Sequence, residues 1–268
     1  MTVLAAVLAL TVTASGWAVP PGAEYVAMGS SFAAGPGIPP SQPSSPTACG
    51  RSSKNYPSLA AAKLRLALTD VSCSGATTAN LLTAPQHGQP PQVDAVTANT
   101  RLVSITIGGN DVNYVGSLFA YSCQTSGGGA QCPSVDQAAI DAALKTVHTK
   151  IGNVVTAVRN KAPRAKVLLV NYLTILPRTG PACTGVPLTQ AQVDFERGVA
   201  RRLADATRRA AAETGASVVD AASASAKHDA CASTPWMEKY NPGQGRAGYH
   251  PTPTGMAAVA DLVIDQIS

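Results

Sequence analysis

The chain has 268 residues, of which 45% are hydrophobic and only 13% are charged, so it is long and apolar enough to bury the core of a globular protein. Aromatic residues make up 4% of the chain, which is few for a surface that stacks on nucleic-acid bases. The net charge of +5 is spread along the sequence, and its densest cluster, residues 197–209, alternates with acidic and apolar residues like a solvated helix face. This composition argues against nucleic acid as a partner.

The N-terminus has the pattern of an export signal. Residues 3–13 form an apolar run that is too short to span a bilayer comfortably, and small residues followed by Pro20 and Pro21 come next. We therefore expect residues 1–18 to be a secretory signal peptide and residues 24–268 to form the folded domain of a secreted or envelope-associated protein. No Lys or Arg precedes the run, which leaves three alternatives: an upstream start, a retained N-terminal anchor or a buried helix.

The six cysteines agree with export. None forms a CxxC pair or lies beside a His at the spacing of metal ligands, so a zinc site is not expected. An even number of cysteines in an exported chain indicates three disulfides, although six cysteines allow many pairings. Sequence order favours the pairs Cys49–Cys73, Cys123–Cys132 and Cys183–Cys231, each of which would restrain a loop-rich stretch.

The first half of the chain alternates between strand and helix patterns. In chain order it predicts a strand over 25–28, an irregular loop over 35–55, a helix over 56–68, a short strand over 69–73 and a strand over 101–107. The last of these is the clearest strand, because its residues are β-branched and alternate in polarity. Thr77 or Thr78 is expected to cap a short helix between the last two of these strands.

The second half continues the alternation with longer helices. It predicts an irregular excursion over 113–134, a helix over 136–161, a strand over 166–172, a helix over 189–214, a strand over 216–219 and a final helix over 253–267. The run within 166–172 is continuously apolar, as expected for a central parallel strand. This repeated alternation, without a break in composition, predicts a single three-layer α/β/α domain with a five-stranded, mostly parallel sheet.

In parallel sheets the functional residues gather where the strands end. The first predicted strand is followed by Ser30 and Ser31, at a turn that would expose a nucleophile at the start of a short helix. Taken alone, a Ser at such a junction also fits a helix N-cap. The other strand ends contribute Gly75 and Asn110, and the loop before the last helix contributes His250.

Acyl transfer needs this inventory of groups: a nucleophile, a base and donors for an oxyanion. In this order they resemble the SGNH (GDSL-type) hydrolase superfamily, and the resemblance covers the chain from Tyr25 to its end. Several flanking segments resemble its secreted actinobacterial esterases and lipases, namely Cys49-Gly50-Arg51-Ser52, Tyr56-Pro57, Ser72 to Thr78, Thr106 to Asp111 and His228 to Cys231. The resemblance implies the flavodoxin-like fold of that superfamily.

The resemblance gives Ser31 the role of nucleophile, because Ser31 stands at the Ser of the family's Gly-Asp-Ser-Leu block. Ser30 replaces the Asp of that block, and Phe32 replaces its Leu. The missing Asp is not the nucleophile, so this departure leaves the chemistry in place. The alternative, in which Ser31 is only a cap and Ser30 is the functional hydroxyl, stays open.

The oxyanion hole that the resemblance implies has several donors. They are the backbone N–H groups of Ser31 and Gly75 and the side-chain amide of Asn110. We expect the carbonyl oxygen of Asn110 to be held by its neighbours, with Asp111 as support. Taken alone, a Gly after a short strand or an Asn after two Gly residues is more often a simple turn residue.

His250 resembles the general base of the family. The family often places an Asp three residues before this His, but that position is Ala247 here, so the usual Ser-His-Asp triad cannot form. The members that this chain most resembles hold the ring by a main-chain carbonyl, so the resemblance implies that the carbonyl of Ala247 or Gly248 accepts the Nδ1 proton. Asp220 and Asp229 stay as distant alternatives.

The sequence thus predicts a secreted serine esterase or lipase that works through a Ser31 acyl-enzyme with His250 as base, and no metal or organic cofactor is implied. Its expected partner is a small-molecule or lipid ester, with a lipid-type ester favoured over a sugar ester; transient contact with a lipid surface is also expected, and we expect a monomer. The loops at 35–55, 113–134 and 177–188 are expected to set the substrate range. Two rival functions are a carbohydrate deacetylase or acyltransferase with the same residues, and a non-catalytic binding protein on the same fold.

Overall fold

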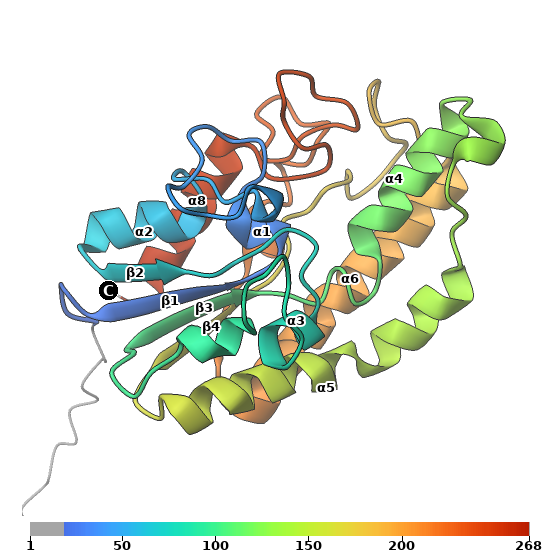
Figure 1. The fold of residues 1–268 in the computed structure, drawn as a ribbon. Helices are drawn as coiled ribbons and strands as arrows, with labels where there is room; N and C mark the ends of the chain where they lie inside the picture. The colour runs from blue at the N-terminus through green and yellow to red at the C-terminus, as the bar shows by residue number, and fades with distance from the viewer. Residues whose placement is uncertain (1–18, 268) are drawn as a thin grey trace, which may run out of the picture.

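The fold is a parallel sheet with helices on both faces, and the computed structural model describes it over residues 19–267 (Figure 1). The expected signal peptide, residues 1–18, lies outside the described residues. The strands pair in the order β2-β1-β3-β4-β5, and every pair is parallel. They are β1 (Glu24–Gly29), β2 (Ala67–Asp70), β3 (Leu102–Thr106), β4 (Lys166–Val170) and β5 (Ser217–Val219). The predicted α/β domain with a mostly parallel, five-stranded sheet is confirmed.

Helices cover the two faces of this sheet. On one face α2 (Tyr56–Leu64) packs against α8 (Pro253–Asp265), and on the other α5 (Gln137–Lys161) packs against α6 (Gln190–Thr214), as Figure 1 shows. Helix α4 (Tyr114–Thr125) lies against α6. The short elements are α1 (Ser31–Ala34), α3 (Thr78–Leu82), α7 (Ala221–Ala224) and the 3-10 turns Thr47–Cys49, Gln92–Ala95 and Gly129–Gln131.

The long helices begin and end at capping residues. The Asp136 side chain accepts a backbone N–H in the first turn of α5, and the Thr189 side chain does the same for α6. Gly215 ends α6 in a left-handed conformation, with a φ of 71°. Thr77, one of the two predicted candidates, is the N-cap of α3, and its N–H and hydroxyl both donate to Asn80 Oδ1 at 2.9 Å.

The core lies between the sheet and its two helical layers. Every residue of β3 is buried, and β4 is buried from Val167 to Val170, as its continuous apolar run predicts. Helix α5 turns one apolar stripe toward the sheet, made of Ile140, Leu144, Val147, Ile151, Val154, Val155 and Val158. Full burial of such a side chain contributes about 1.5–3 kcal/mol, so this stripe holds α5 in place.

The prediction of a helix over 56–68 was wrong at its C-terminal end. The helix stops at Leu64, because Arg65 adopts a left-handed conformation with a φ of 56°. The N–H of Leu66 then returns to the carbonyl of Ala61, which closes the helix end. Residues 67–70 form the strand instead, and Ala67 pairs with Glu24 of β1. The strand therefore begins earlier than its apolar pattern suggested.

The prediction of an irregular excursion over 113–134 was also wrong, because residues 114–125 form α4. Its buried residues Tyr114, Leu118 and Tyr121 recur at helical spacing. This helix packs on α6, where the rings of Tyr121 and Phe195 meet edge to face at 6.2 Å. Tertiary packing thus stabilises a segment whose Gly and Ser residues favour a loop.

The three predicted disulfides are confirmed. Cys49 pairs with Cys73, Cys123 with Cys132, and Cys183 with Cys231, closing loops with sequence separations of 24, 9 and 48 residues. Each restricts the unfolded chain, which is worth about 2–4 kcal/mol for a typical disulfide. None of the helices within residues 19–267 is both long enough and apolar enough to cross a membrane.

Replacing Gly29 by Ala is expected to destabilise the fold by about 1–3 kcal/mol, the usual cost of a strained backbone position. Gly29 has a φ of 138°, and a Cβ at this position would lie 2.4 Å from the carbonyl oxygen of Thr106. Chemical denaturation measures the free energy of unfolding. The matched control is Gly198→Ala on α6, where nothing lies within 4 Å of the added Cβ and stability is expected to stay equal or rise. Equal stabilities of the Gly29→Ala protein and the parent would contradict this account.

Candidate active site

The predicted site residues meet at the carboxyl ends of the strands. Ser31, Gly75, Asn110 and His250 line one cleft of about 330 Å³, although they come from four separate segments of the chain. Its walls also include Pro36, Ser74, Val115, Gly116 and Ala247. The edge of the sheet that the sequence pointed to is therefore the edge where these side chains gather.

The turn that presents Ser31 is held to two neighbouring segments. The N–H of Ser30 donates to the carbonyl of Thr106 at 2.9 Å, which ties the turn to β3. The buried Gln92 side chain holds the backbone of Gly29 twice: its Oε1 accepts the N–H at 2.7 Å and its Nε2 donates to the carbonyl at 3.0 Å. The end of β1 is thus fixed before the chain turns into α1.

The two hydroxyls of the turn have different partners. The Oγ of Ser31 lies 2.8 Å from Nε2 of His250. The Oγ of Ser30 points elsewhere and lies 3.2 Å from the hydroxyl of Tyr172, with Ser30 only 1% exposed. Only Ser31 is therefore within reach of a base, which favours it over Ser30 as the functional hydroxyl.

His250 is held by a main-chain carbonyl. Its Nδ1 lies 2.6 Å from the carbonyl oxygen of Gly248, which can only accept, so Nδ1 donates in this contact. Tyr249 between them has a φ of 53°, and its hydroxyl is 2.6 Å from Ser122 Oγ on α4. The left-handed residue turns the Gly248 carbonyl back under the imidazole ring, and its side chain fixes that turn to the body of the protein.

The two distant carboxylates that could have oriented His250 are occupied elsewhere. Asp220 accepts from the amide of Asn171 at 2.7 Å and from Ser223, and Asp229 accepts from the N–H of Cys231 at 2.8 Å. Of the two carbonyls named from the sequence, the one in contact is that of Gly248 rather than Ala247.

Burial controls the protonation of His250. Removal of the ring from water lowers its pKa below the ordinary value of 6.5, and the contact with the Gly248 carbonyl offsets part of this effect by favouring the charged form. The imidazole is thus neutral at pH 7, with a proton on Nδ1 and a free lone pair on Nε2 toward Ser31. That is the form that a general base requires.

The expected support of Asn110 by Asp111 was wrong. It is the amide nitrogen of Asn110 that is held, because Nδ2 donates to the carbonyl of Ala76 at 2.8 Å, and the residue lines the cleft. Asp111 instead accepts from the N–H of Thr78 at 3.0 Å and from its hydroxyl at 2.6 Å. These contacts join the loop after β2 to the loop after β3, and so bring Gly75 close to Asn110.

The sequence did not predict Tyr172 and Gln92, whose side chains hold the backbone next to the site. The Tyr172 hydroxyl accepts the N–H of Gly109 at 2.8 Å, and burial raises its pKa to about 12, so it stays protonated. Its ring packs against Phe32 with a centroid distance of 4.7 Å. A Tyr after an apolar strand and a Gln in a Pro-rich loop gave no signal, because both act only through contacts made across the fold.

No group of His, Cys, Asp and Glu side chains suited to hold a metal occurs among residues 19–267. His228 lies in a loop, with its ring stacked on Trp236 at 4.2 Å and its Nδ1 in contact with Thr234. It therefore has a structural explanation away from the cleft.

The fold and the cleft together define a hydrolase of the acyl-transfer class, with a Ser–His contact beside backbone and amide donors. Comparison with known proteins supports this class: the pattern of the GDSL-like Lipase/Acylhydrolase family matches residues 27–258. The chain belongs to this family and is a carboxylic ester hydrolase.

Proteins with similar sequences and structures include lipases and a phospholipase. The chain is 35% identical to "Lipase 2" of Streptomyces coelicolor over 254 residues, which is 91% of this chain and 86% of that protein. It is 28% identical to the crystal structure of an extracellular lipase from Streptomyces rimosus, with a TM-score of 0.73 over 90% of this chain and 99% of that one. Phospholipase A1 from Streptomyces albidoflavus is 27% identical, with a TM-score of 0.72 over 91% of this chain and 98% of the other.

Replacement of Gln92 by Met is expected to lower the free energy of unfolding by about 1–3 kcal/mol, because the buried N–H of Gly29 loses its acceptor. Thermal or chemical denaturation measures the change. Gln131→Met is the matched control, since Gln131 is exposed and its side chain makes no hydrogen bond within the described chain. Equal losses of stability in the two variants would show that Gln92 does not hold the turn.

Proposed function

We propose that Ser31 and His250 form the catalytic pair of this hydrolase and act through a covalent acyl-enzyme. The observation that supports this most directly is the 2.8 Å contact between Ser31 Oγ and His250 Nε2, with His250 Nδ1 engaged by the Gly248 carbonyl on its other side. A nucleophile, a base and a group that orients the base are thus in line.

In the acylation step, His250 Nε2 takes the proton of the Ser31 hydroxyl while Oγ attacks the carbonyl carbon of the ester. The tetrahedral intermediate collapses when the bond to the alcohol breaks, and His250 gives its proton to the leaving alkoxide. In the second step His250 removes a proton from water, the hydroxide attacks the acyl-enzyme, and the carboxylic acid leaves as Ser31 regains its proton. The Gly248 carbonyl stabilises the imidazolium less than a carboxylate would.

Three donors support the developing oxyanion in this mechanism: the backbone N–H groups of Ser31 and Gly75 and the second N–H of Asn110. Gly75 is exposed to the cleft and has a φ of 79°, which suits a residue without a Cβ. The bond from Asn110 to Ala76 is supporting evidence, because it fixes the amide plane while it leaves one donor for the substrate.

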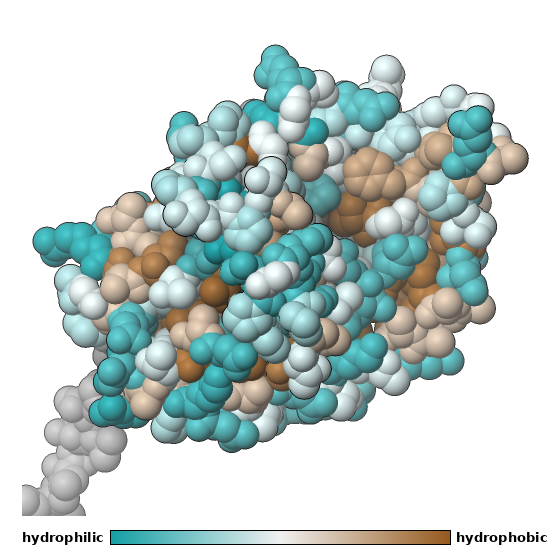
Figure 2. All heavy atoms as spheres, viewed as in Figure 1, coloured by the Kyte–Doolittle hydropathy of each residue, from teal (hydrophilic) through white to brown (hydrophobic). Residues whose placement is uncertain are grey.

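We further propose that the substrate is a lipid-type ester and that the enzyme is secreted. The names of the Streptomyces relatives, lipases and a phospholipase A1, support a lipid substrate. Apolar side chains reach the surface in the region of α4 (Figure 2), where Val115 lines the cleft and Phe119 lies one turn further on, 5.7 Å from the ring of Tyr240. Val115 and Phe119 thus form an apolar surface beside the cleft, which suits contact with an acyl chain at a lipid surface.

Export is supported by the three disulfides and by the extracellular lipase among the structural relatives. We propose that residues 1–18 are removed as a signal peptide, and that residues 24–268 act as a monomer without nucleic acid as a partner. N-terminal sequencing of the exported protein tests this proposal, and a retained Met1 would contradict it.

Replacement of Ser31 by Ala is expected to lower kcat by at least about 10³-fold and to abolish labelling by a fluorophosphonate. Asn110→Ala is expected to lower kcat by about 10²–10³-fold, the usual effect of losing one oxyanion donor. Hydrolysis of nitrophenyl esters and of phospholipid measures both changes.

The matched controls for these variants are Asp220→Asn and Asp229→Asn, each of which is expected to keep kcat within about tenfold of the parent. A loss of about 10³-fold in kcat in either control would show that the aspartate orients His250. The protein would then use a Ser-His-Asp triad and not a pair held by a carbonyl. Full activity of the Ser31→Ala protein would refute the mechanism as a whole.

The pH dependence of kcat/KM is expected to follow His250 of the free enzyme. Only the neutral ring accepts the Ser31 proton, so the rate rises with pH through the pKa of His250 and then reaches a plateau. Because burial lowers that pKa, the midpoint of the rise lies below about 6.5, the ordinary value for imidazole. A midpoint above that value, or a rate independent of pH, would contradict this role. His228→Gln is expected to leave the profile unchanged.

A further inference from the structure

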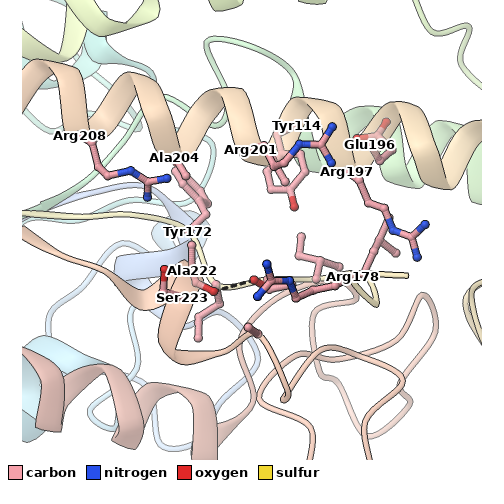
Figure 3. A pocket seen from close by; sticks show the side chains of 16 residues that line it. Tyr114, Tyr172, Arg178, Glu196, Arg197, Arg201, Ala204, Arg208, Ala222 and Ser223 are labelled. Atoms are coloured by element: carbon pink, nitrogen blue, oxygen red, sulfur yellow. Dashed lines mark hydrogen bonds between the residues drawn. The ribbon is translucent and has the colours of Figure 1, made fainter. Parts of the chain in front are cut away.

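A second cavity, of about 350 Å³, lies between α6 and the chain that follows β4 (Figure 3). None of the four residues proposed for catalysis lines it. Its volume is near the lower end of the range of about 300–1,000 Å³ that small-molecule sites occupy. The cavity is therefore large enough for a ligand of its own.

The rim of this cavity is cationic. Figure 3 shows four arginines on different sides of the space, namely Arg178, Arg197, Arg201 and Arg208. Arg197 and Arg208 form ion pairs with aspartates of α6 at 3.0 and 2.9 Å. Arg178 and Arg201 are exposed and form neither an ion pair nor a hydrogen bond with any residue of the described chain. Two guanidinium groups are thus free to bind an anion.

Glu196 is the only acidic residue among those that line the cavity. Its side chain is buried, and neither carboxyl oxygen has a hydrogen-bond partner among the described residues. Burial raises its pKa to about 8, an effect that the nearby Ser117 hydroxyl offsets only in part. At pH 7 Glu196 is therefore mostly neutral, and it cancels little of the charge of the arginines.

The inner walls of the cavity are mostly apolar. Leu173 and Leu176 line it from the chain after β4, and Ala200 and Ala204 line it from α6. The Tyr114 hydroxyl points into the space in Figure 3 and forms no hydrogen bond within the described chain. An apolar pocket with one free hydroxyl and a cationic rim suits a ligand with an apolar body and an anionic end.

We propose that this cavity binds an amphipathic carboxylate, whose anionic end is held by Arg178 and Arg201 and whose chain packs against Leu173 and Ala204. A planar guanidinium binds a carboxylate through two parallel hydrogen bonds, which matches this anion in shape as well as in charge. The choice of a carboxylate rests in part on the ester hydrolysis proposed above, because that reaction releases such acids. The cationic rim and the apolar walls do not depend on it.

Tyr172 separates this cavity from the turn that bears Ser31. It lines the cavity, while its hydroxyl contacts Gly109 and Ser30 on the side of the cleft. A ligand in the cavity and an acyl group on Ser31 thus occupy different spaces. Binding is expected to be independent of the catalytic pair.

Isothermal titration calorimetry with decanoate at pH 7, below its micelle concentration, tests this site in the full-length Ser31→Ala protein. The double variant Arg178→Ala/Arg201→Ala is expected to bind decanoate at least tenfold more weakly, because charge-assisted hydrogen bonds are lost. Arg209→Ala is the matched control, since Arg209 lies on the same helix, does not line the cavity and pairs with Glu213 at 2.7 Å. Its affinity is expected to equal that of the parent.

Two further ligands show which parts of decanoate the cavity recognises. Decanol lacks the carboxylate, and inorganic phosphate lacks the apolar chain. Each is expected to bind at least tenfold more weakly than decanoate. Unchanged affinity in the double variant, no binding of decanoate, or equal binding of decanol or phosphate would overturn the proposal. None of these titrations measures hydrolysis, so failure of the catalytic proposal is seen separately, in the activity of the Ser31→Ala protein.

Discussion

The placement of Ser31 depends on how closely two backbones approach at the end of the central strands. A Cβ on Gly29 would lie 2.4 Å from the Thr106 carbonyl oxygen, so only a residue without a side chain lets β1 end against β3 in this way. That carbonyl also accepts the N–H of Ser30 at 2.9 Å. The same strand, β3, leads directly to Asn110. One close contact therefore fixes the serine turn relative to Asn110, the proposed oxyanion donor. Gln92 accepts the N–H of Gly29 and donates to its carbonyl, which holds the same turn.

The fold was predictable where local signals and packing agree. The apolar runs at 101–107 and 166–172 and the amphipathic stretches at 136–161 and 189–214 identified β3, β4, α5 and α6, because their periodicity reflects burial that the sheet then provides. One prediction was wrong because the backbone conformation of a single residue determines where the helix ends. A left-handed Arg65 ends α2 early, and no propensity favours an Arg there. Helix α4 was missed because its stability comes from α6 rather than from its own Gly- and Ser-containing sequence.

The residues proposed to react were predictable from the sequence, and most of the groups that hold them were not. Ser31, Gly75 and Asn110 follow strands and His250 precedes the last helix, in the order typical of the family, and the structure brings all four into one cleft. Most of the groups that hold these residues give no signal in the sequence, because they act through contacts between distant segments. Asp111 joins two loops through Thr78 instead of holding its neighbour, and a left-handed Tyr249 brings the Gly248 carbonyl to the imidazole. The resemblance already implied a main-chain carbonyl at His250, but a carbonyl has no side-chain signature, so only the structure could choose Gly248 over Ala247.

The central claim is that His250 works without a carboxylate, as a buried neutral imidazole whose Nδ1 proton is held by the Gly248 carbonyl. Nitrogen-15 NMR of the histidine-labelled protein tests this claim directly, because the two ring nitrogens report the tautomer and their titration reports the pKa. The His250 signals are assigned by their loss in His250→Gln. The account predicts the Nδ1–H tautomer at pH 7 and a pKa below the ordinary value of 6.5. An Nε2–H tautomer, or a pKa above that value, would contradict it.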